Sequence, residues 1–352
     1  MQTLNSLLEL MNEKNASDLH LTIGSPPRLR IDGILKPMNE DKLSLEHITK
    51  YLKEYLNDKQ LEQIKLGKEL DFTIGIPGLS RYRVNVYKQR GNPVASFRRL
   101  PFDVPKIDSL GLTDAVIELT NRRKGLILIT GGTGSGKSTT LAAMAHKISN
   151  ELEGHIITIE DPIEYLYPHS KALINQREVG IDSATFASAL KSALRQDPDV
   201  VIIGELRDPE SIQAALTIAE TGHLVLATLH SNDAAQTMTR IIDVFQPEKQ
   251  EVIRMNLSMS LIGIVSQQLI PKTDNGIALA LEILINTPSI KNLIRDNNIH
   301  QINNYILSGT KDGMIRMDDS ILKLYNENLI SKESALNYAH DPSELSKKLS
   351  NF

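Results

Sequence analysis

The sequence predicts an α/β protein of two domains, in which a small α+β domain precedes a larger domain built on a parallel sheet flanked by helices. Three observations predict this. Helical and strand-like periods are mixed over about the first hundred residues, residues 100–108 contain two prolines and little periodicity, and apolar strands alternate with helices beyond them. We therefore expect domains at 1–99 and 109–352, a linker at 100–108, and a helical C-terminal region from about residue 288.

Two kinds of period define the elements of the first domain. Apolar residues at positions 4, 7, 8 and 11 have the spacing of an amphipathic helix, and the residues after them alternate with a period of two. Asp32-Gly33, between two such runs, is typical of a hairpin turn. The expected order is a helix at 4–11, strands at 19–23 and 29–31, a helix at 44–66, and strands at 72–76, 82–86 and 95–97.

The second domain alternates between strands and helices. Its expected order is a strand at 126–130, a helix from 137, a strand at 155–160, a helix at 184–194, a strand at 199–204, a helix at 209–220 and a strand at 223–228. From about Gln236 onward we expect mostly helix, broken by an apolar run at 277–285.

The composition limits the classes of function. The 352 residues carry a formal net charge of −4, so no overall positive field favours nucleic acid or an acidic membrane surface. The absence of cysteine excludes disulfides and thiolate zinc sites. No apolar stretch approaches the ~18–20 residues of a membrane span, and the N-terminus lacks the basic end and apolar core of a signal peptide. We expect a cytosolic protein that meets a membrane only through a partner.

A full phosphate-loop motif follows the first strand of the second domain. Gly131–Ser138 fits the pattern G-x-x-x-x-G-K-[ST], and its setting between an apolar strand and a helix disfavours a chance glycine-rich turn. We expect Lys137 to reach the β- and γ-phosphates of ATP and the Ser138 hydroxyl to ligate Mg²⁺. The candidate nucleotide-binding residues are Gly131, Gly132, Thr133, Gly134, Ser135, Gly136, Lys137, Ser138 and Thr139.

Reactive side chains follow three further strands, at the sheet edge where parallel sheets bind ligands. Glu205 follows an apolar strand in the manner of a Walker B acid, which holds Mg²⁺ through water or orients the attacking water. Glu164, clustered with Glu160 and Asp161, is a second candidate for such a role, and His230 is placed to sense the γ-phosphate. The alternatives are a solvated acid, a solvent-facing turn and a histidine that serves only local hydrogen bonding.

Arginines of the first domain are candidates for stabilising phosphoryl transfer, because its transition state gains from an added cation. Arg83 and Arg98, with Arg81, alternate with apolar residues, so they share the polar face of one sheet. From the residues alone, an ordinary solvated strand face is the preferred interpretation.

Together these residues resemble the motifs of the secretion ATPase superfamily that powers type II secretion and type IV pili, and the resemblance covers nearly the whole chain. Residues 16–33 resemble the family's PAS-like N-terminal domain. Residues 160–165 are similar to its Asp box, 204–208 to its Walker B motif and 222–231 to its His box. Residues 289–295 resemble a C-terminal segment associated with pilus retraction, although they begin Ser-Ile-Lys where Ala-Ile-Arg is usual.

The resemblance implies a RecA-like core and a homohexameric ring that hydrolyses ATP with Mg²⁺. It implies that ATP sits between the two domains and that Arg83 and Arg98 approach its phosphates. It also implies that the ring turns a PilC-like inner-membrane platform protein at the cytoplasmic face of that membrane. Assembly motors of the family carry an extra N-terminal domain and usually a four-cysteine zinc site, so this chain favours pilus retraction over pilus assembly or type II secretion.

Two other functions remain open. A PilU-like accessory paralogue with little hydrolysis of its own would carry the same motifs, and such a paralogue is also a candidate partner. A RecA-like helicase or DNA translocase would share the phosphate loop and the acid-ended strand. The chain has no Trp, only 4% aromatic residues and no basic stripe for stacking bases, so we expect no nucleic acid partner.

Overall fold

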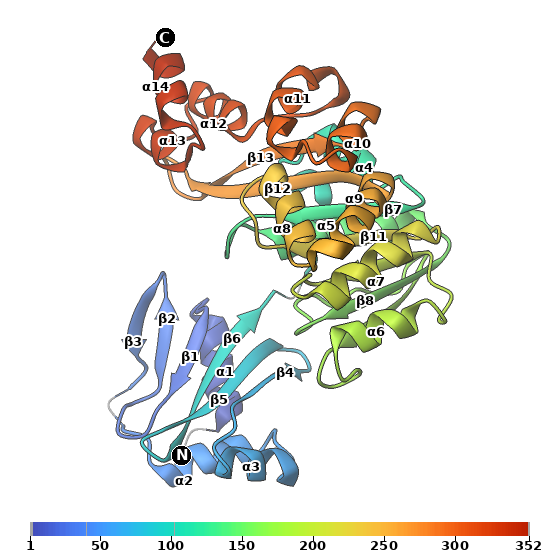
Figure 1. Ribbon diagram of the computed structural model, residues 1–352. Coiled ribbons are helices and arrows are strands. Elements are labelled where there is room, and N and C mark those ends of the chain that lie inside the picture. Colours follow the sequence, from blue (N-terminus) through green and yellow to red (C-terminus); the bar gives the residue numbers. More distant parts are fainter. Residues whose placement is uncertain (1–2, 40, 102, 351–352) are drawn as a thin grey trace. The chain divides into compact units, whose positions relative to one another are not determined.

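The computed structural model describes residues 3–39, 41–101 and 103–350. The chain divides into two compact units. The first unit ends at Asp103 and also takes in Pro162–Leu166, and the second comprises the rest of the chain from Val104. Each unit has its own sheet and its own buried core, and the colours of Figure 1 pass from blue in the first unit to red at the end of the second.

The first unit is a six-stranded antiparallel sheet in the order β3-β2-β1-β6-β5-β4, accompanied by three helices. Its elements are α1 (Leu4–Glu13), β1 (Asp18–Leu21), β2 (Arg28–Ile31), β3 (Ile34–Pro37), α2 (Leu45–Lys53), α3 (Asp58–Lys65), β4 (Leu70–Ile76), β5 (Ser80–Gln89) and β6 (Asn92–Leu100). The predicted hairpin is confirmed, because Asp32 and Gly33 join β2 to β3 at φ values of 51° and 78°.

The single helix expected at 44–66 is wrong, because the structure contains two helices there. Asn57 starts α3 by accepting a hydrogen bond from the N–H of Gln60, whose side chain accepts one from the N–H of Asn57. This reciprocal capping box satisfies two N–H groups that an unbroken helix would bond differently, and it favours a new helix start at this point.

One face of this sheet is buried and the other carries arginines. Tyr82 and Val84 on β5 and Phe97 on β6 are buried. Arg83 and Arg98 alternate with them and stand directly opposite each other in the β5–β6 pair. The shared face predicted for these two arginines is therefore confirmed.

The second unit is a seven-stranded sheet in the order β13-β12-β7-β11-β10-β8-β9. All its pairs are parallel except β12 with β13. The strands are β7 (Gly125–Thr130), β8 (His155–Glu160), β9 (Leu173–Glu178), β10 (Val200–Ile203), β11 (Leu224–Leu229), β12 (Leu261–Pro271) and β13 (Ile277–Ile285). The predicted α/β core is thus confirmed, with an antiparallel strand at one edge.

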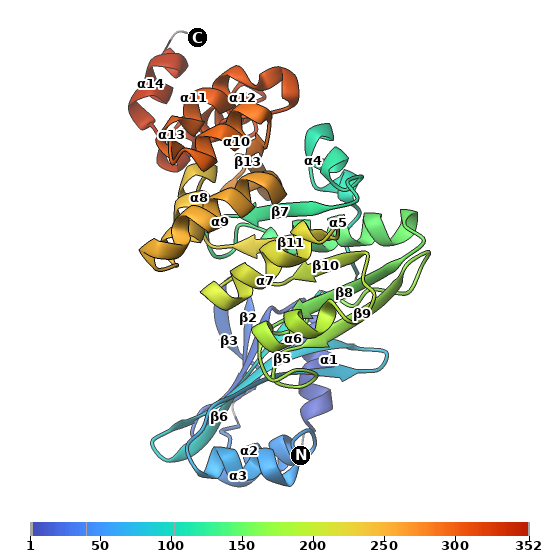
Figure 2. The same ribbon diagram turned by 45° about the vertical axis from the view of Figure 1, so that its right-hand side comes forward.

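Helices cover both faces of this sheet, with one apolar cluster under α6 to α9 and another under α4 and α5 (Figure 2). These helices are α4 (Asp114–Leu119), α5 (Lys137–Glu151), α6 (Phe186–Ala193), α7 (Pro209–Glu220), α8 (Ala234–Asp243) and α9 (Pro247–Ser260). The C-terminal part adds α10 (Pro288–Arg295), α11 (Ile302–Ser308), α12 (Met317–Asn326), α13 (Lys332–Tyr338) and α14 (Pro342–Ser350). Short 3₁₀ segments lie at Ile107–Ser109, Ile299–Gln301 and Thr310–Asp312. Among the described residues, no helix has both the length and the apolar character to cross a membrane.

Two strands of this sheet, β9 and β12, were not predicted. β9 is an edge strand of largely polar sequence, so it offers no apolar run. β12 falls where continuous helix was expected. It is largely buried between β7 and β13, so its sequence lacks the alternation of a half-exposed strand and resembles a buried helix.

Candidate active site

The phosphate loop connects β7 to α5, which begins at Lys137. Gly131 has a φ of 148°, and a Cβ atom at this position would lie 2.4 Å from Ser135 Oγ and 2.5 Å from the backbone oxygen of Gln267. Gly136 has a φ of 85°, in the left-handed region that glycine favours. The tight curvature of the loop therefore depends on glycine at both positions.

The loop has the features of a phosphate cradle. It leads directly into α5, so the positive end of the helix dipole and the N–H groups of its first turn lie at the loop. Ser138 occupies the second position of that helix. The Ser135 hydroxyl is buried without a hydrogen-bond partner among the described residues. These groups, with Lys137, fit the phosphates of a nucleotide and an accompanying Mg²⁺.

Lys137 folds back over the loop. It is only 8% exposed, and its Nζ donates hydrogen bonds to the carbonyl oxygens of Gly131 at 3.0 Å and Gly132 at 2.7 Å. The same nitrogen lies 3.4 Å from Nδ1 of His230. Lys137 therefore links the loop to the residue that follows β11.

His230 lies between the loop and the acid that follows β10. Its Nε2 is 3.4 Å from Oε1 of Glu205, while its Nδ1 faces Lys137. Burial and the positive charge of Lys137 lower the pKa of His230, and the Glu205 carboxylate acts in the opposite direction. The imidazole therefore favours its neutral form at neutral pH, with one nitrogen as donor and the other as acceptor.

Two arginines that the sequence analysis missed complete this cluster. The Nε of Arg207 lies 2.7 Å from Oε2 of Glu205, and its Nη1 lies 3.5 Å from Oδ2 of Asp161. Arg240, on α8, donates a hydrogen bond to the backbone oxygen of His230. The sequence could have indicated Arg207 as a site residue, because it lies only two residues after Glu205. It gave no such indication for Arg240, which lies ten residues after His230.

The three acids of the Asp box, Glu160, Asp161 and Glu164, have different surroundings. Glu160 is buried and accepts hydrogen bonds from Thr158 Oγ1 at 2.6 Å and Gln176 Nε2 at 3.1 Å. Asp161 joins the cluster through its arginine partner. Glu164 is half-buried and belongs to the segment Pro162–Leu166, which groups with the first unit.

Arg83 and Arg98 also belong to the first unit, where each is paired with an acid. Arg83 Nη2 is 2.6 Å from Oδ2 of Asp71, and Arg98 Nε is 2.8 Å from Oδ1 of Asp18. Burial raises the pKa of Asp18, but hydrogen bonds from Arg98 and Ser17 outweigh burial and hold that pKa below its usual value. The side chains of Arg83 and Arg98 remain 40% and 69% exposed.

β12, which the sequence analysis missed, supports the loop with polar side chains. Gln267 is 1% exposed, and its Nε2 donates to the Ser135 backbone oxygen at 3.0 Å and to Thr140 Oγ1 at 3.2 Å. The neighbouring Ser266 Oγ accepts a hydrogen bond from Thr130 Oγ1 at 2.8 Å. The available signal was a run of three polar residues, 266–268, inside an apolar strand sequence, which indicates buried hydrogen bonding.

Comparison with known proteins gives matches along almost the whole chain. The family model described as "Type II/IV secretion system protein" matches residues 1–325. The type IV pilus retractation ATPase PilT of Pseudomonas aeruginosa is 43% identical over 339 residues, which cover 96% of this chain and 98% of that protein. The type IV pilus ATPase PilU of the same organism is 39% identical over 340 residues, covering 96% of this chain and 89% of PilU.

A solved structure agrees with both sequence matches. The crystal structure of the pilus retraction motor PilT with bound ADP superposes with a TM-score of 0.93 at 44% identity, covering 99% of this chain and 100% of that one. The sequence matches span both units, and the structural match includes the sheet that carries the phosphate loop. The chain belongs to the type II/IV secretion system protein family, and within it is a PilT-like ATPase of the type IV pilus retraction and twitching-motility group.

Proposed function

We propose that this protein is a homohexameric motor that hydrolyses ATP to drive retraction of a type IV pilus. The observation that carries the proposal is the match to a retraction motor over 99% of the chain, at a TM-score of 0.93. In the proposed cycle the ring turns a PilC-like platform protein from the cytoplasmic face of the inner membrane. A chain of two domains, 1–99 and 109–352, joined at 100–108, suits this task because a change of domain angle converts hydrolysis into motion.

We assign the loop residues 131–139 to the nucleotide. Lys137 binds the β- and γ-phosphates, as expected of the lysine of this motif, and the Ser138 hydroxyl is the proposed Mg²⁺ ligand. Within the described residues, no group of three or more His, Cys, Asp or Glu side chains is arranged to hold a metal. A Mg²⁺ ion here would therefore take most of its oxygen ligands from phosphates and water, and it would neutralise phosphate charge.

We assign Glu205 the role of orienting the attacking water, or of holding Mg²⁺ through water, because it follows β10 and contacts His230. Glu164 is the second candidate carboxylate for this role. His230 is the proposed sensor of the γ-phosphate, since one of its ring nitrogens faces Lys137 and the other faces Glu205.

Arg83 and Arg98 are the proposed cations of the transition state. Their side chains are partly exposed, and each guanidinium group is held in place by a carboxylate on a neighbouring strand. Arg83→Ala and Arg98→Ala should each lower kcat for ATP more than they weaken ADP binding. Equal losses in kcat and in ADP affinity would contradict the proposed role.

The proposed function is tested by counting surface pili and measuring twitching in cells whose chromosomal copy carries Lys137→Ala. Abundant pili on immobile cells are expected. Bald cells would assign the protein to pilus assembly and overturn the proposal. The matched control is Lys147→Ala on the same helix, because Lys147 pairs with Glu151, away from the loop, and this variant should twitch normally.

A second candidate function, that of a PilU-like accessory ATPase, is favoured by the 39% identity to PilU over 96% of the chain. Phosphate release by the purified protein separates the two functions. A steady ATPase rate together with the hyperpiliated phenotype supports the primary motor. Absence of phosphate release, with retraction that persists when Lys137 is replaced, would assign the accessory role.

A further inference from the structure

Glu282, on β13, is a carboxylate buried at the junction of two helices. It is 4% exposed. Its Oε1 accepts a hydrogen bond at 2.8 Å from the N–H of Ala234, the first residue of α8, and the same carboxyl accepts one from the N–H of Met317, the first residue of α12. A single side chain therefore holds the N-termini of both helices.

Neither helix could easily replace this carboxylate. The residue that precedes α12 is Arg316, whose side chain makes no capping hydrogen bond. The residue that precedes α8 is Asp233, but its side chain caps the N–H of Gln236 instead. The N–H at the first position of each helix thus depends on Glu282, and the positive ends of both helix dipoles favour a negative charge there.

Glu282 is connected to the active site through its strand partner on β12 and through helix α8. In the β12–β13 pair it stands opposite Ser266, which accepts from Thr130 just before the phosphate loop. Helix α8, which Glu282 holds at its start, fixes the residues after β11 in two ways. Arg240 donates to the backbone oxygen of His230, and Ser231 Oγ lies 2.6 Å from Thr237 Oγ1.

Glu282 is also connected to the C-terminal lobe, through the start of α12. We define this lobe as α12 to α14. The chain pairs with β13 beside Glu282, through reciprocal backbone hydrogen bonds between Ile283 and Ile315 of 2.8 and 3.1 Å. Ser320 Oγ accepts from the N–H of Leu281 at 3.0 Å, so the first turn of α12 is fixed to this strand.

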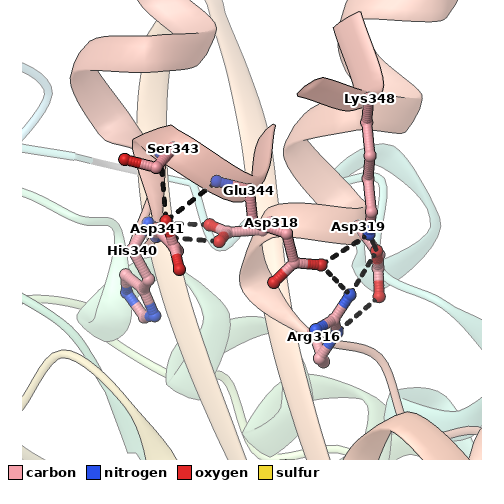
Figure 3. Close-up of polar contacts among 8 residues, drawn as sticks. All are labelled: Arg316, Asp318, Asp319, His340, Asp341, Ser343, Glu344 and Lys348. Atoms are coloured by element: carbon pink, nitrogen blue, oxygen red, sulfur yellow. Dashed lines mark hydrogen bonds and ion pairs between the residues drawn. The ribbon is translucent and has the colours of Figure 1, made fainter. Parts of the chain in front are cut away.

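The same turn of α12 anchors the rest of the lobe (Figure 3). Asp318 accepts hydrogen bonds from the N–H groups of His340 at 2.7 Å and Asp341 at 2.9 Å. Asp319 lies 3.0 Å from Lys348 Nζ on α14. Arg316 contacts an acid on each of these two helices, Asp319 on α12 at 2.8 Å and Glu344 on α14 at 3.2 Å. A shift of the lobe would therefore be transmitted to the turn that Glu282 holds.

We propose that Glu282 is a positioning residue that ties the C-terminal lobe to helix α8 and, through α8, sets the place of His230 in the active site. This inference rests on the role proposed above for His230. It predicts that Glu282 affects the rate of hydrolysis while the phosphate loop continues to bind nucleotide, because the loop has its own support from Gln267.

The ionisation of Glu282 should make kcat depend on pH, which a purely structural residue would not do. The pKa of Glu282 is raised to about 7, chiefly by burial and also by the negative charges of Asp233 on α8 and Asp318 on α12. The hydrogen bonds from the N–H groups of Ala234 and Met317 act in the opposite direction. The residue opposite on β12, Ser266, does not titrate. As pH falls through about 7, the carboxyl becomes neutral and loses the charge that holds both helix ends, so kcat should fall over that range.

The test compares Glu282→Gln, His230→Ala and the double variant in the full-length protein. Glu282→Gln keeps the size of the side chain and one acceptor oxygen. It should lower kcat at pH 8 by about tenfold, the order expected for a hydrogen bond to a charged group. The dissociation constant for a fluorescent ADP analogue should stay within about twofold, and the fall in kcat near pH 7 should disappear. The matched control is Glu327→Gln, a half-exposed acid at the far end of α12, which should retain the wild-type rate and pH profile.

The double variant tests whether Glu282 acts through His230. If it does, adding Glu282→Gln to His230→Ala lowers kcat no further, because the two effects are coupled. Additive losses would overturn the inference, as would a wild-type rate for Glu282→Gln or a loss of ADP affinity equal to the loss in kcat. A normal rate for His230→Ala alone would instead contradict the proposed role of His230, so the two failures are distinguishable.

Discussion

Lys137 Nζ lies 3.4 Å from Nδ1 of His230, although the two residues are 93 positions apart in the sequence. The contact follows from strand order, because β7 and β11 are neighbouring parallel strands whose last residues, Thr130 and Leu229, are paired in the register. The residues that follow these two strands therefore lie at the same edge of the sheet. The phosphate loop and His230 therefore meet without any sequence signal that links them.

Replacing Lys137 should remove nucleotide-dependent activity without unfolding the protein. Lys137→Ala deletes the cation at the loop, so ADP affinity and ATPase rate should both fall by at least about a hundredfold. Calorimetric ADP titration and phosphate release measure this, and a melting curve checks the fold. Lys147→Ala is the control on the same helix, and a full ATPase rate in Lys137→Ala would contradict the site assignment.

Glu205→Gln should separate binding from turnover. The amide keeps the size of the side chain but loses the charge that orients water or an ion, so kcat should fall by about a hundredfold or more while ADP binding persists. Single-turnover phosphate release measures the step. Glu164→Gln is the comparison, and an unchanged rate in Glu205→Gln together with a large loss in Glu164→Gln would transfer the role to Glu164.

The pKa of His230 should respond in opposite directions to its two neighbours. Burial and Lys137 lower this pKa, and Glu205 raises it, so Lys137→Ala should shift it upward and Glu205→Gln should shift it further downward. NMR titration of the imidazole signals measures both shifts, with His230→Ala to assign the resonance. In the wild type, His230 should already be neutral at pH 7, so it does not account for a change in kcat at that pH. A His230 signal that does not move in either variant would contradict the observed arrangement.

The sequence was informative where chemistry depends on local spacing. The phosphate loop needs glycine at left-handed positions and a lysine at a fixed offset, so the motif Gly131–Ser138 could be recognised from the sequence. Alternation along β5 and β6 correctly predicted that Arg83 and Arg98 share one face of the sheet. The hairpin at Asp32 and Gly33 followed from turn chemistry in the same way.

Groups that reach the site through tertiary structure were not predictable in this way. β12 is buried between two strands and lacks a period of two, so Gln267 was missed with it. Arg240 contacts His230 only because α8 lies beside the residues that follow β11. Glu282 gave no signal within an apolar run, since its partners are backbone N–H groups of two helices distant in sequence.

Gln267→Leu should weaken nucleotide binding although Gln267 lies behind the loop. The substitution removes two hydrogen bonds, to the Ser135 backbone oxygen and to Thr140 Oγ1, and leaves that buried oxygen without this donor. We expect KM for ATP and the dissociation constant for ADP to rise by about tenfold, with a smaller effect on kcat. Gln250→Leu is the control, because its amide also donates to a backbone oxygen, that of Phe245, at the start of α9. If the Gln267 variant binds ADP as tightly as this control does, β12 does not support the loop, and the curvature fixed by Gly131 and Gly136 is sufficient on its own.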